Sequence, residues 1–243
     1  MIFGAIVAGG TGSRMSSRCE ISIDKPLHDI PKQFLPIKGK PLICYSIKQF
    51  LCSSIDRLFI GVHADYTDYM NDILRWYFPE NANEITLVPG GGDRNGTVMN
   101  IIDKASEMFG ENGHYIITHD AVRPFVTADI INQNIELVQK YGAVNTVCPA
   151  VDTVVVSDGE FIESVPERSR LYYGQTPQCF DMGKLKRLYL SLDEADRAAL
   201  TDCTKIFTLC GERVYLATGD SVNMKITTKN DYFVANALSE YLL

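Results

Sequence analysis

A short apolar segment followed at once by a glycine-rich turn opens the chain, and it limits the possible folds more than any other feature. Residues 2–8 read IFGAIVA, and residues 9–14 read GGTGSR. An unbroken apolar segment of this length is typical of a strand buried on both faces, as in a parallel sheet covered by helices. Glycines in the turn allow the backbone to approach a ligand closely. We therefore expect a parallel α/β sheet with a ligand-binding turn after its first strand.

Two cations follow this turn and suit a phosphate ligand. Successive backbone N–H groups can form an anion-binding nest, to which Arg14 adds a planar charged fork and Lys32 a compact ammonium. The turn lacks the third glycine of a dinucleotide-binding G-x-G-x-x-G motif, and it lacks the lysine of a P-loop. A strand followed by a merely flexible turn would contain the same glycines. The turn alone indicates an anion site without identifying the anion.

Length and charge exclude several classes of protein. A chain of 243 residues without a linker-like segment suits one core, so we expect a single domain over residues 1–243. The formal net charge of −7 argues against a nucleic-acid partner, which needs clustered Lys and Arg. No apolar stretch approaches the ~20 residues of a membrane span, and no signal-peptide pattern precedes the first strand. We therefore expect a cytoplasmic protein with no membrane partner.

The cysteines point to neither disulfides nor a structural metal site. The chain contains 7 of them, and no two are spaced as C-x-x-C. An odd number without paired spacing predicts neither a disulfide framework nor a zinc site. We expect free and mostly buried thiols, because free cysteine behaves as a small hydrophobe.

Apolar periodicity divides the rest of the chain into alternating strands and helices. We predict strands at residues 57–62, 85–88, 115–118, 144–150, 171–180, 213–217 and 223–227. We predict helices at residues 42–51, 66–77, 98–109, 128–141, 182–191, 195–200 and 229–242, and a further helix that begins within residues 201–205. Thr127 and Gly142 are suitable caps for the helix between them. Trp76 and the other aromatic residues of its helix are expected to pack in the core or against another helix.

Three further segments lie between a predicted strand and the helix that follows it. Residues 89–97 read PGGGDRNGT, a second glycine-rich turn whose polar groups either read a base edge or serve geometry only. Residues 119–125 read HDAVRPF, and a charged group there needs a partner because unpaired buried charge is costly. Asp120 and Arg123 could pair with one another or bind a ligand, and His119 is expected to be structural. Residues 16–30 form a long loop, which we interpret as a mobile surface segment or a lid.

A β-hairpin is expected around Asp158 and Gly159. The flanking residues, 153–156 and 160–162, favour extended strands, and Asp-Gly is a strong hairpin signal. A hairpin that protrudes from an α/β sheet has little core of its own, so it needs another surface to pack against.

The segments AGGTGSRM, PKQFLP, THDAVRPF, GQTPQ and NMKITT, in this order, resemble the cytidylyltransferases that join CTP to a sugar-alcohol phosphate. The resemblance covers nearly the whole chain and includes two branches, ribitol-5-phosphate cytidylyltransferase and 2-C-methyl-D-erythritol 4-phosphate cytidylyltransferase. It implies a three-layer, Rossmann-like nucleotidyltransferase fold with a mostly parallel twisted sheet. It also implies a protruding β-hairpin arm at about residues 151–170, which embraces a second subunit to form a homodimer.

The resemblance also assigns site residues. It implies that Arg14 and Lys32 stabilise the transition state. It implies nucleotide contacts from Ala8, Gly9, Gly10, Gly12, Gly91, Asp93, Thr97 and Asp120. It implies acceptor contacts from Asp120, Arg123, Thr153, Arg168, Thr176, Thr201 and Lys225, of which Thr153 and Arg168 would come from the second subunit. Mg²⁺ is expected to be bound mainly through the CTP phosphates, and no protein ligand for it is identified.

Details of the motifs favour ribitol 5-phosphate as the acceptor. THDAVRPF with Val122 and Phe125, YYGQTPQCF, and TDCTK with Lys205 resemble the ribitol branch. The methylerythritol branch more often contains HDAARP and an acidic TDEA-type segment. We therefore predict that the product is CDP-ribitol, used for teichoic acid of the cell wall or for capsule. The methylerythritol reaction of isoprenoid synthesis is the alternative, and a catalytically silent nucleotide-binding module is a further one.

Overall fold

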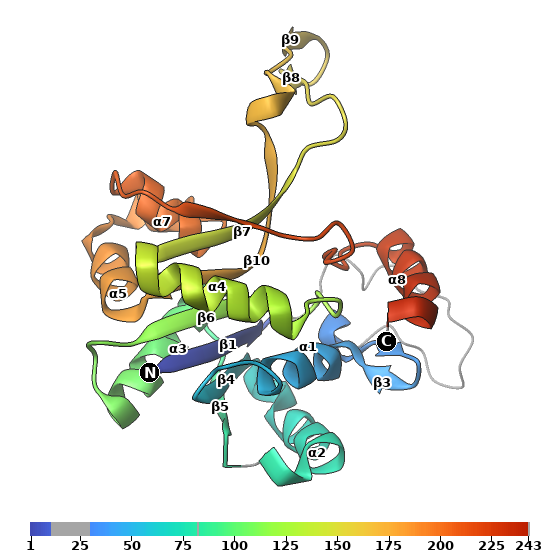
Figure 1. The fold of residues 1–243 in the computed structure, drawn as a ribbon, viewed down its shortest axis with the longest axis vertical. Helices are drawn as coiled ribbons and strands as arrows, with labels where there is room; N and C mark the ends of the chain where they lie inside the picture. The colour runs from blue at the N-terminus through green and yellow to red at the C-terminus, as the bar shows by residue number, and fades with distance from the viewer. Residues whose placement is uncertain (11–29, 82, 243) are drawn as a thin grey trace.

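The computed structural model describes residues 1–10, 30–81 and 83–242, and a seven-stranded sheet is the centre of this described part (Figure 1). The strand order is β11-β7-β10-β6-β1-β4-β5. The bounds are β1 Ile2–Ala8, β4 Arg57–Val62, β5 Ile85–Pro89, β6 Tyr115–Asp120, β7 Ala143–Pro149, β10 Tyr172–Asp181 and β11 Tyr215–Thr218. Strand β10 is antiparallel to both of its neighbours, and the other pairs are parallel. The predicted mostly parallel sheet is confirmed.

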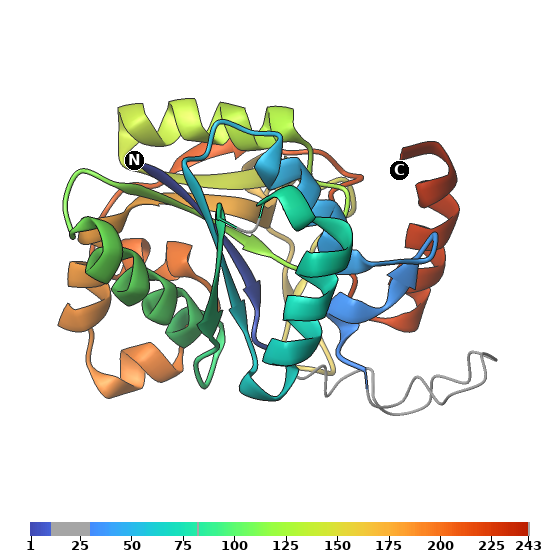
Figure 2. The same ribbon diagram turned by 90° about the horizontal axis from the view of Figure 1, so that it is seen from below.

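Helices cover both faces of the sheet, so the fold has the three layers predicted (Figure 2). One face packs on α1 Leu42–Leu51, α2 Thr67–Tyr77 and α4 Ala128–Tyr141. The other packs on α3 Arg94–Phe109, α5 Met182–Ser191 and α7 Cys203–Leu209. Side chains of a strand alternate between the faces, so Ile6 of β1 joins the first core and Phe3 the second. Both layers therefore hold the central strands in place.

Shorter elements complete the described part of the chain. Helix α6 is Glu194–Ala198, and 3-10 turns occur at Lys32–Phe34, Ala64–Tyr66, Pro79–Asn81 and Arg168–Arg170. A small hairpin pairs β2, Pro36–Ile37, with β3, Lys40–Pro41. Helix α8, Lys229–Leu242, packs on this hairpin, where Tyr232 and Ala235 belong to the same third buried cluster as Ile37. None of the described helices is long and apolar enough to span a membrane.

Local capping explains where two of the helices begin. The hydroxyl of Thr127 accepts a hydrogen bond from the N–H of Ile130, and Gly142 ends α4 with φ 76°, as predicted. Helix α3 begins four residues before the predicted start at Val98. The carboxylate of Asp93 caps it by accepting from the N–H of Gly96 at 2.6 Å. Asp93 is therefore part of the helix boundary rather than of a loop.

The predicted hairpin is present but shorter than expected. Its strands are β8, Val156–Ser157, and β9, Ile162–Ser164, and Gly159 between them has φ 113°. Figure 1 shows this arm extending away from the rest of the molecule. Its apolar side chains Phe161 and Ile162 are 73% and 65% exposed, so the part of the chain that the structure describes leaves them largely uncovered.

Two predictions are wrong. Residues 223–227 are not a strand, because their backbone groups bind side chains and the loop after β6 instead of a neighbouring strand. Trp76 is 81% exposed and lies outside the core, although Met70 and Ile73 of the same helix are buried. The described cysteines are free, and three of them, Cys44, Cys179 and Cys203, are buried. Cys19 and the long loop at residues 16–30, except Ile30, lie outside the described residues.

Candidate active site at the carboxyl ends of the strands

A pocket of about 510 Å³ opens where the strand order reverses direction. The connection after β1 leads to β4 on one side, and the connection after β5 returns the chain to β6 on the other side of β1. Ligands of open α/β sheets bind in the crevice at such a point. The pocket is lined by residues that follow the strands, and by two lysines and an arginine. The lining residues are Val7, Ala8, Gly9, Gly10, Lys32, Gln33, His63, Gly91, Gly92, Asp93, Arg94, Thr97, Asp120, Ala121, Val122 and Lys225.

The two glycine-rich turns contact each other at this pocket, and close packing between and within the turns explains some of their glycines. A Cβ on Gly90 would lie 3.2 Å from the Cα of Gly9. A Cβ on Gly91 would lie 2.7 Å from the backbone N of Thr97 and closer still to the carbonyl carbon of Gly96. Gly10 and Gly92 have open space at the same position. Some glycines are therefore needed for packing, and others leave the backbone accessible from the pocket. Gly12 lies outside the described residues.

The hydroxyl of Thr97 is occupied within the second turn. It accepts a hydrogen bond from the N–H of Gly91 at 2.9 Å and donates to the carbonyl of Asp93 at 2.9 Å. The Asp93 carboxylate caps α3 at the same place. Both side chains fix the shape of the turn, so the groups best placed to meet a ligand are those of its backbone.

Gln33 fixes the first turn, and sequence reasoning missed it. Its buried amide donates to the carbonyls of Ala8 and Gly10 at 2.8 and 3.0 Å. Both carbonyls are thereby satisfied, which favours a turn whose N–H groups are left for an anion. The signal in the sequence was a glutamine beside Lys32 in a segment otherwise apolar.

Among the described residues, three cations border the pocket, and two of them were predicted. The ammonium of Lys32 donates to the carbonyl of Thr227 at 2.6 Å. Lys225 and Arg94 lie on either side of Asp120, and Arg94 is the cation that sequence reasoning missed. The predicted Arg14 lies outside the described residues. Arg168 is on the arm, where it donates to the carbonyl of Val151, and it does not line this pocket.

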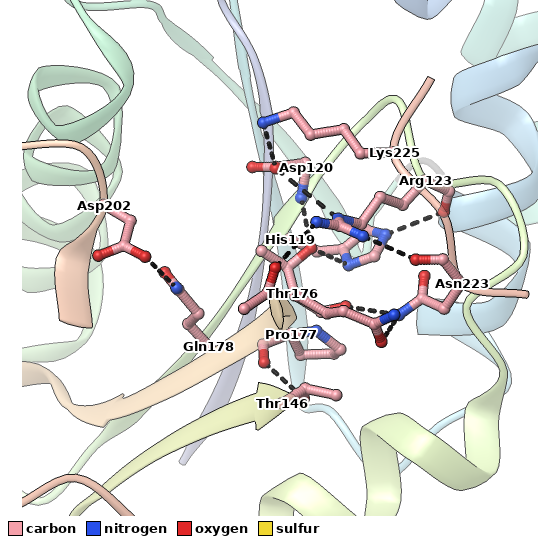
Figure 3. A network of polar contacts seen from close by, with 12 residues as sticks. His119, Asp120, Arg123, Thr146, Thr176, Pro177, Gln178, Asp202, Asn223 and Lys225 are labelled. Carbon is pink, nitrogen blue, oxygen red and sulfur yellow. Dashed lines mark hydrogen bonds and ion pairs between the residues drawn. The ribbon is translucent and has the colours of Figure 1, made fainter. Parts of the chain in front are cut away.

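Asp120 at the end of β6 is the centre of the charged groups (Figure 3). Its Oδ1 lies 2.8 Å from Nε of Arg94, and its Oδ2 lies 2.8 Å from Nζ of Lys225. Nε of Arg123 is 3.9 Å from Oδ2. Burial alone would raise the pKa of Asp120, but Arg94 and Lys225 outweigh it and hold the pKa well below its usual range. Asp120 is therefore a buried carboxylate that stays ionised.

The guanidinium of Arg123 is bound by other groups of the protein. Its side chain is 9% exposed, and it donates to the carbonyls of Asn223 and Gly174 at 2.7 and 3.4 Å. Burial lowers the pKa of Arg123, opposed by the charge of Asp120. Arg123 does not line the described pocket, so in this arrangement it supports the segment that carries Lys225.

His119 is structural, as predicted, and shares a hydrogen-bond network with Thr176 (Figure 3). Its Nε2 lies 3.1 Å from the carbonyl of Arg123, so Nε2 carries the proton of the neutral ring. Its Nδ1, 2.9 Å from the Thr176 hydroxyl, then accepts from that hydroxyl, which in turn accepts from the N–H of Asp120. Burial lowers the pKa of His119 to about 4. The Thr176 hydroxyl is therefore engaged within the protein.

The remaining predicted residues lie away from the pocket. Thr153 is exposed on the arm, and Thr201 is exposed just before α7. The cap of α7 is Asp202, whose Oδ1 accepts from the N–H of Lys205 and whose Oδ2 accepts from the amide of Gln178. Among the described residues no three His, Cys, Asp or Glu side chains gather as they would around a metal ion.

The geometry suits a ligand that carries several negative charges. An acidic chain collects two lysines and an arginine around one pocket, which glycines of both turns also line. Such an arrangement can bind a polyphosphate and hold a second anion beside it, because cations and oriented amides neutralise charges that would otherwise repel.

Comparison with known proteins finds one matching family model and solved structures with a similar fold. The model for 2-C-methyl-D-erythritol 4-phosphate cytidylyltransferase matches residues 2–240. The solved 4-diphosphocytidyl-2C-methyl-D-erythritol synthase of Anaerococcus prevotii is 24% identical, with a TM-score of 0.78 over 99% of this chain and 98% of that one. The 2-C-methyl-D-erythritol 4-phosphate cytidylyltransferase of Francisella tularensis is also 24% identical, with a TM-score of 0.75 over 97% and 98%. That of Thermus thermophilus is 23% identical, with a TM-score of 0.72 over 99% and 100%.

These comparisons bear on the predicted branch as well. They agree with the expected fold and with a cytidylyltransferase. The names of the matched family and of these structures refer to the methylerythritol branch. They therefore support the alternative acceptor better than the ribitol 5-phosphate that the motifs favoured.

Proposed function

This chain belongs to the 2-C-methyl-D-erythritol 4-phosphate cytidylyltransferase family and is a nucleotidyltransferase, and on that premise we propose that its pocket joins CTP to a short polyol phosphate. The observation that carries the proposal is the gathering of Lys32, Arg94 and Lys225 around one pocket of a chain with net charge −7. Two anionic substrates need such a site, because each repels the other in its absence.

The proposed reaction is an in-line attack by the acceptor phosphate on the α-phosphorus of CTP. A bond forms between an acceptor phosphate oxygen and that phosphorus, the bond to the bridging oxygen breaks, and pyrophosphate leaves with the electron pair. The attacking phosphate is already ionised, so no general base is required. This agrees with a His119 that is buried among protein partners. Catalysis then consists of positioning and charge stabilisation.

In this proposal Lys32 neutralises the triphosphate, together with the N–H groups of Gly9 and Gly10. Lys32 lines the pocket on the side of the first glycine turn, whose shape Gln33 fixes. The second turn, with the backbone of Gly91 and Asp93, supplies polar groups for the cytosine and ribose. Arg14 is the second predicted catalytic cation, and its role stays a prediction from the sequence.

The acceptor phosphate is assigned to Lys225. Its side chain is 42% exposed, and its present partner is the carboxylate of Asp120, which is suited to a substrate hydroxyl. We also propose a homodimer, in which the arm of one subunit brings Thr153 and Arg168 to the acceptor site of the other. The arm supports this because its apolar residues Phe161 and Ile162 are exposed.

Mg²⁺ fits this site as a companion of the nucleotide. Mg²⁺ keeps several waters and is typically bound through substrate phosphates and one or two carboxylates. The carboxylates that line the described part of the pocket are Asp93, which caps α3, and Asp120, whose two oxygens already face cations. The ion would therefore be held mainly through the nucleotide phosphates. Bound there, the ion would neutralise phosphate charge in the transition state. Lys32 and Lys225 would neutralise the remaining phosphate charge.

The proposed acceptor is 2-C-methyl-D-erythritol 4-phosphate, which the family name supports. A second candidate is ribitol 5-phosphate, because two residues of the segments that resemble the ribitol branch lie at the pocket or beside it. Val122 lines the pocket, and Cys203 contacts Arg94. Differences of a methyl group change binding by only ~1–3 kcal/mol, so pocket shape and these contacts decide between the two.

The proposal is tested by pyrophosphate release from CTP with each polyol phosphate in separate reactions. ATP, GTP and UTP serve as nucleotide controls. Release with one acceptor and CTP alone identifies the reaction and the branch. CTP binding without turnover on either acceptor would support the silent nucleotide-binding module instead.

A further inference from the structure

Arg94, the first residue of α3, lines the pocket, but no individual role in the proposed reaction has been assigned to it. Its Nε donates to Oδ1 of Asp120 at 2.8 Å, which joins the start of α3 to the end of β6. The side chain is 18% exposed, and its buried Nη2 has no hydrogen-bond partner among the described residues. Arg94 is thus a largely buried cation committed to one carboxylate oxygen.

A second contact holds Arg94 independently of Asp120. Its Nη1 lies 3.7 Å from Sγ of Cys203, a fully buried thiol at the start of α7. That thiol in turn donates to the side-chain oxygen of Asn95 at 3.4 Å. The guanidinium is therefore fixed between two helix starts and a strand end.

Arg94 and Lys225, the two cations 2.8 Å from Asp120, differ in their freedom to move. Lys225 binds the other oxygen, Oδ2, and its side chain is 42% exposed compared with 18% for Arg94. A lysine is a flexible point charge, whereas an arginine fork held at several atoms loses little freedom when it binds. Lys225 is therefore the cation that is freer to leave Asp120, and Arg94 is the more firmly held.

We propose that Arg94 is a positioning residue, which holds Oδ1 of Asp120 so that Oδ2 alone exchanges Lys225 for a substrate hydroxyl. The inference rests on the proposed function, because it assigns the hydroxyl and the phosphate to substrates of that site. Without Arg94, the departure of Lys225 would leave Arg123, whose Nε is 3.9 Å away, as the one cation near Asp120 among the described residues. The carboxylate would then be free to rotate and would no longer orient the hydroxyl.

The test is a double-mutant cycle of Arg94→Gln and Asp120→Asn, with Arg94→Lys as the conservative variant. Arg94→Gln is expected to lower kcat/KM for the acceptor roughly 10- to 100-fold, as lost supporting hydrogen bonds do at other sites. In the Asp120→Asn background the same substitution should change kcat/KM less than about threefold, because Arg94 acts through Asp120. Arg94→Lys should recover part of the loss.

CTP affinity, measured by calorimetry, distinguishes this role from direct nucleotide binding. Arg94→Gln in the Asp120→Asn background should leave the CTP Kd within about threefold. A Kd that rises equally in both backgrounds would overturn the proposal, since Arg94 would then contact the nucleotide itself. Additive losses of kcat/KM would overturn it as well. Arg75→Gln is the matched control, because Arg75 forms an exposed ion pair with Asp72 on α2.

Urea unfolding separates this inference from the proposed function and from misfolding. Removal of one partner of a buried pair is destabilising, whereas removal of both is often tolerated. The double variant should therefore unfold at a higher urea concentration than the summed shifts of the single variants predict. Additive shifts would contradict the pairing of Arg94 with Asp120. This result does not depend on whether the protein turns over either polyol phosphate.

Discussion

The ammonium of Lys225 lies 2.8 Å from Oδ2 of Asp120, and the lysine is the exposed partner of the pair, with 42% of its side chain accessible against 10% for the aspartate. The pair joins the loop at residues 223–227 to the end of β6. The cation assigned to the acceptor is thus kept at the pocket by a carboxylate that other residues hold in place.

Lys225→Ala should weaken acceptor binding more than nucleotide binding. A hydrogen bond to a charged group contributes about 1.5–3 kcal/mol, so the acceptor KM should rise roughly 10- to 100-fold. The CTP Kd should change much less. Steady-state kinetics and calorimetry measure the two quantities. Lys104→Ala is the control, because Lys104 is 39% exposed and pairs with Glu107 at 2.9 Å far from the pocket lining. An equal change of the acceptor KM in Lys225→Ala and Lys104→Ala would contradict the assignment of Lys225 to the acceptor phosphate.

Gly91→Ala should destabilise the protein, because the new methyl group would meet the backbone of Gly96 and Thr97. Overpacking of this kind costs about 1–3 kcal/mol. Gly92→Ala is the matched control one residue away, where a Cβ meets nothing within 4 Å. Urea unfolding should show a lower midpoint for Gly91→Ala and a nearly unchanged one for Gly92→Ala. Equal midpoints would show that the backbone of Gly96 and Thr97 can move away from residue 91 without cost.

His119 should make stability depend on pH between about 6.5 and 4. Its pKa is about 4 in the folded protein because burial disfavours the charged ring, whereas an unfolded histidine titrates near 6.5. The unfolded chain therefore binds more protons in this window, and stability falls as pH falls through it. The loss is roughly 3 kcal/mol at about 1.4 kcal/mol per pKa unit. Below about pH 4 this contribution is constant.

His119→Asn tests that origin, since asparagine can donate and accept but does not titrate. Its unfolding free energy should be lower than that of the wild type at pH 7, and its slope between pH 6.5 and 4 should be smaller. An unchanged slope in the variant would assign the pH dependence to other groups.

The dimer proposal is tested by mixing two impaired variants, assayed at an acceptor concentration well below their raised KM. Lys225→Ala removes an acceptor contact within a subunit, and Arg168→Ala removes the one expected from its partner. A heterodimer of the two contains one intact site, so random mixing should restore about a quarter of the wild-type activity. No recovery after subunit exchange would show that Arg168 serves its own chain or no site at all.

The sequence predicts elements best where their limits are coded locally. The bounds of α1, α4, α5 and α8 agree with those predicted, since helical periodicity and end signals such as Thr127 and Gly142 coincide there. Residues 223–227 alternate like a strand, yet their carbonyls and N–H groups are taken by Arg123, Val122 and Lys32. Local pattern cannot reveal partners that lie about 100 positions away.

The same limit applies to the site. The glycine turns, Lys32, Asp120 and Lys225 follow from motifs, and the structure brings them to one pocket. Arg94 and Gln33 were missed because each acts on a distant group, the carboxylate of Asp120 and the carbonyls of Ala8 and Gly10. Arg123 looks like a ligand clamp in the sequence because burial and its backbone partners are visible only in three dimensions.

The most direct test of the central claim is the initial rate of pyrophosphate release with CTP and a polyol phosphate, for the wild type beside Lys32→Ala. If the cations of this pocket stabilise the transferring phosphate, the wild type turns over with CTP, and the variant loses at least ~10²-fold in kcat while its CTP affinity falls far less. An unchanged kcat in Lys32→Ala would contradict the account.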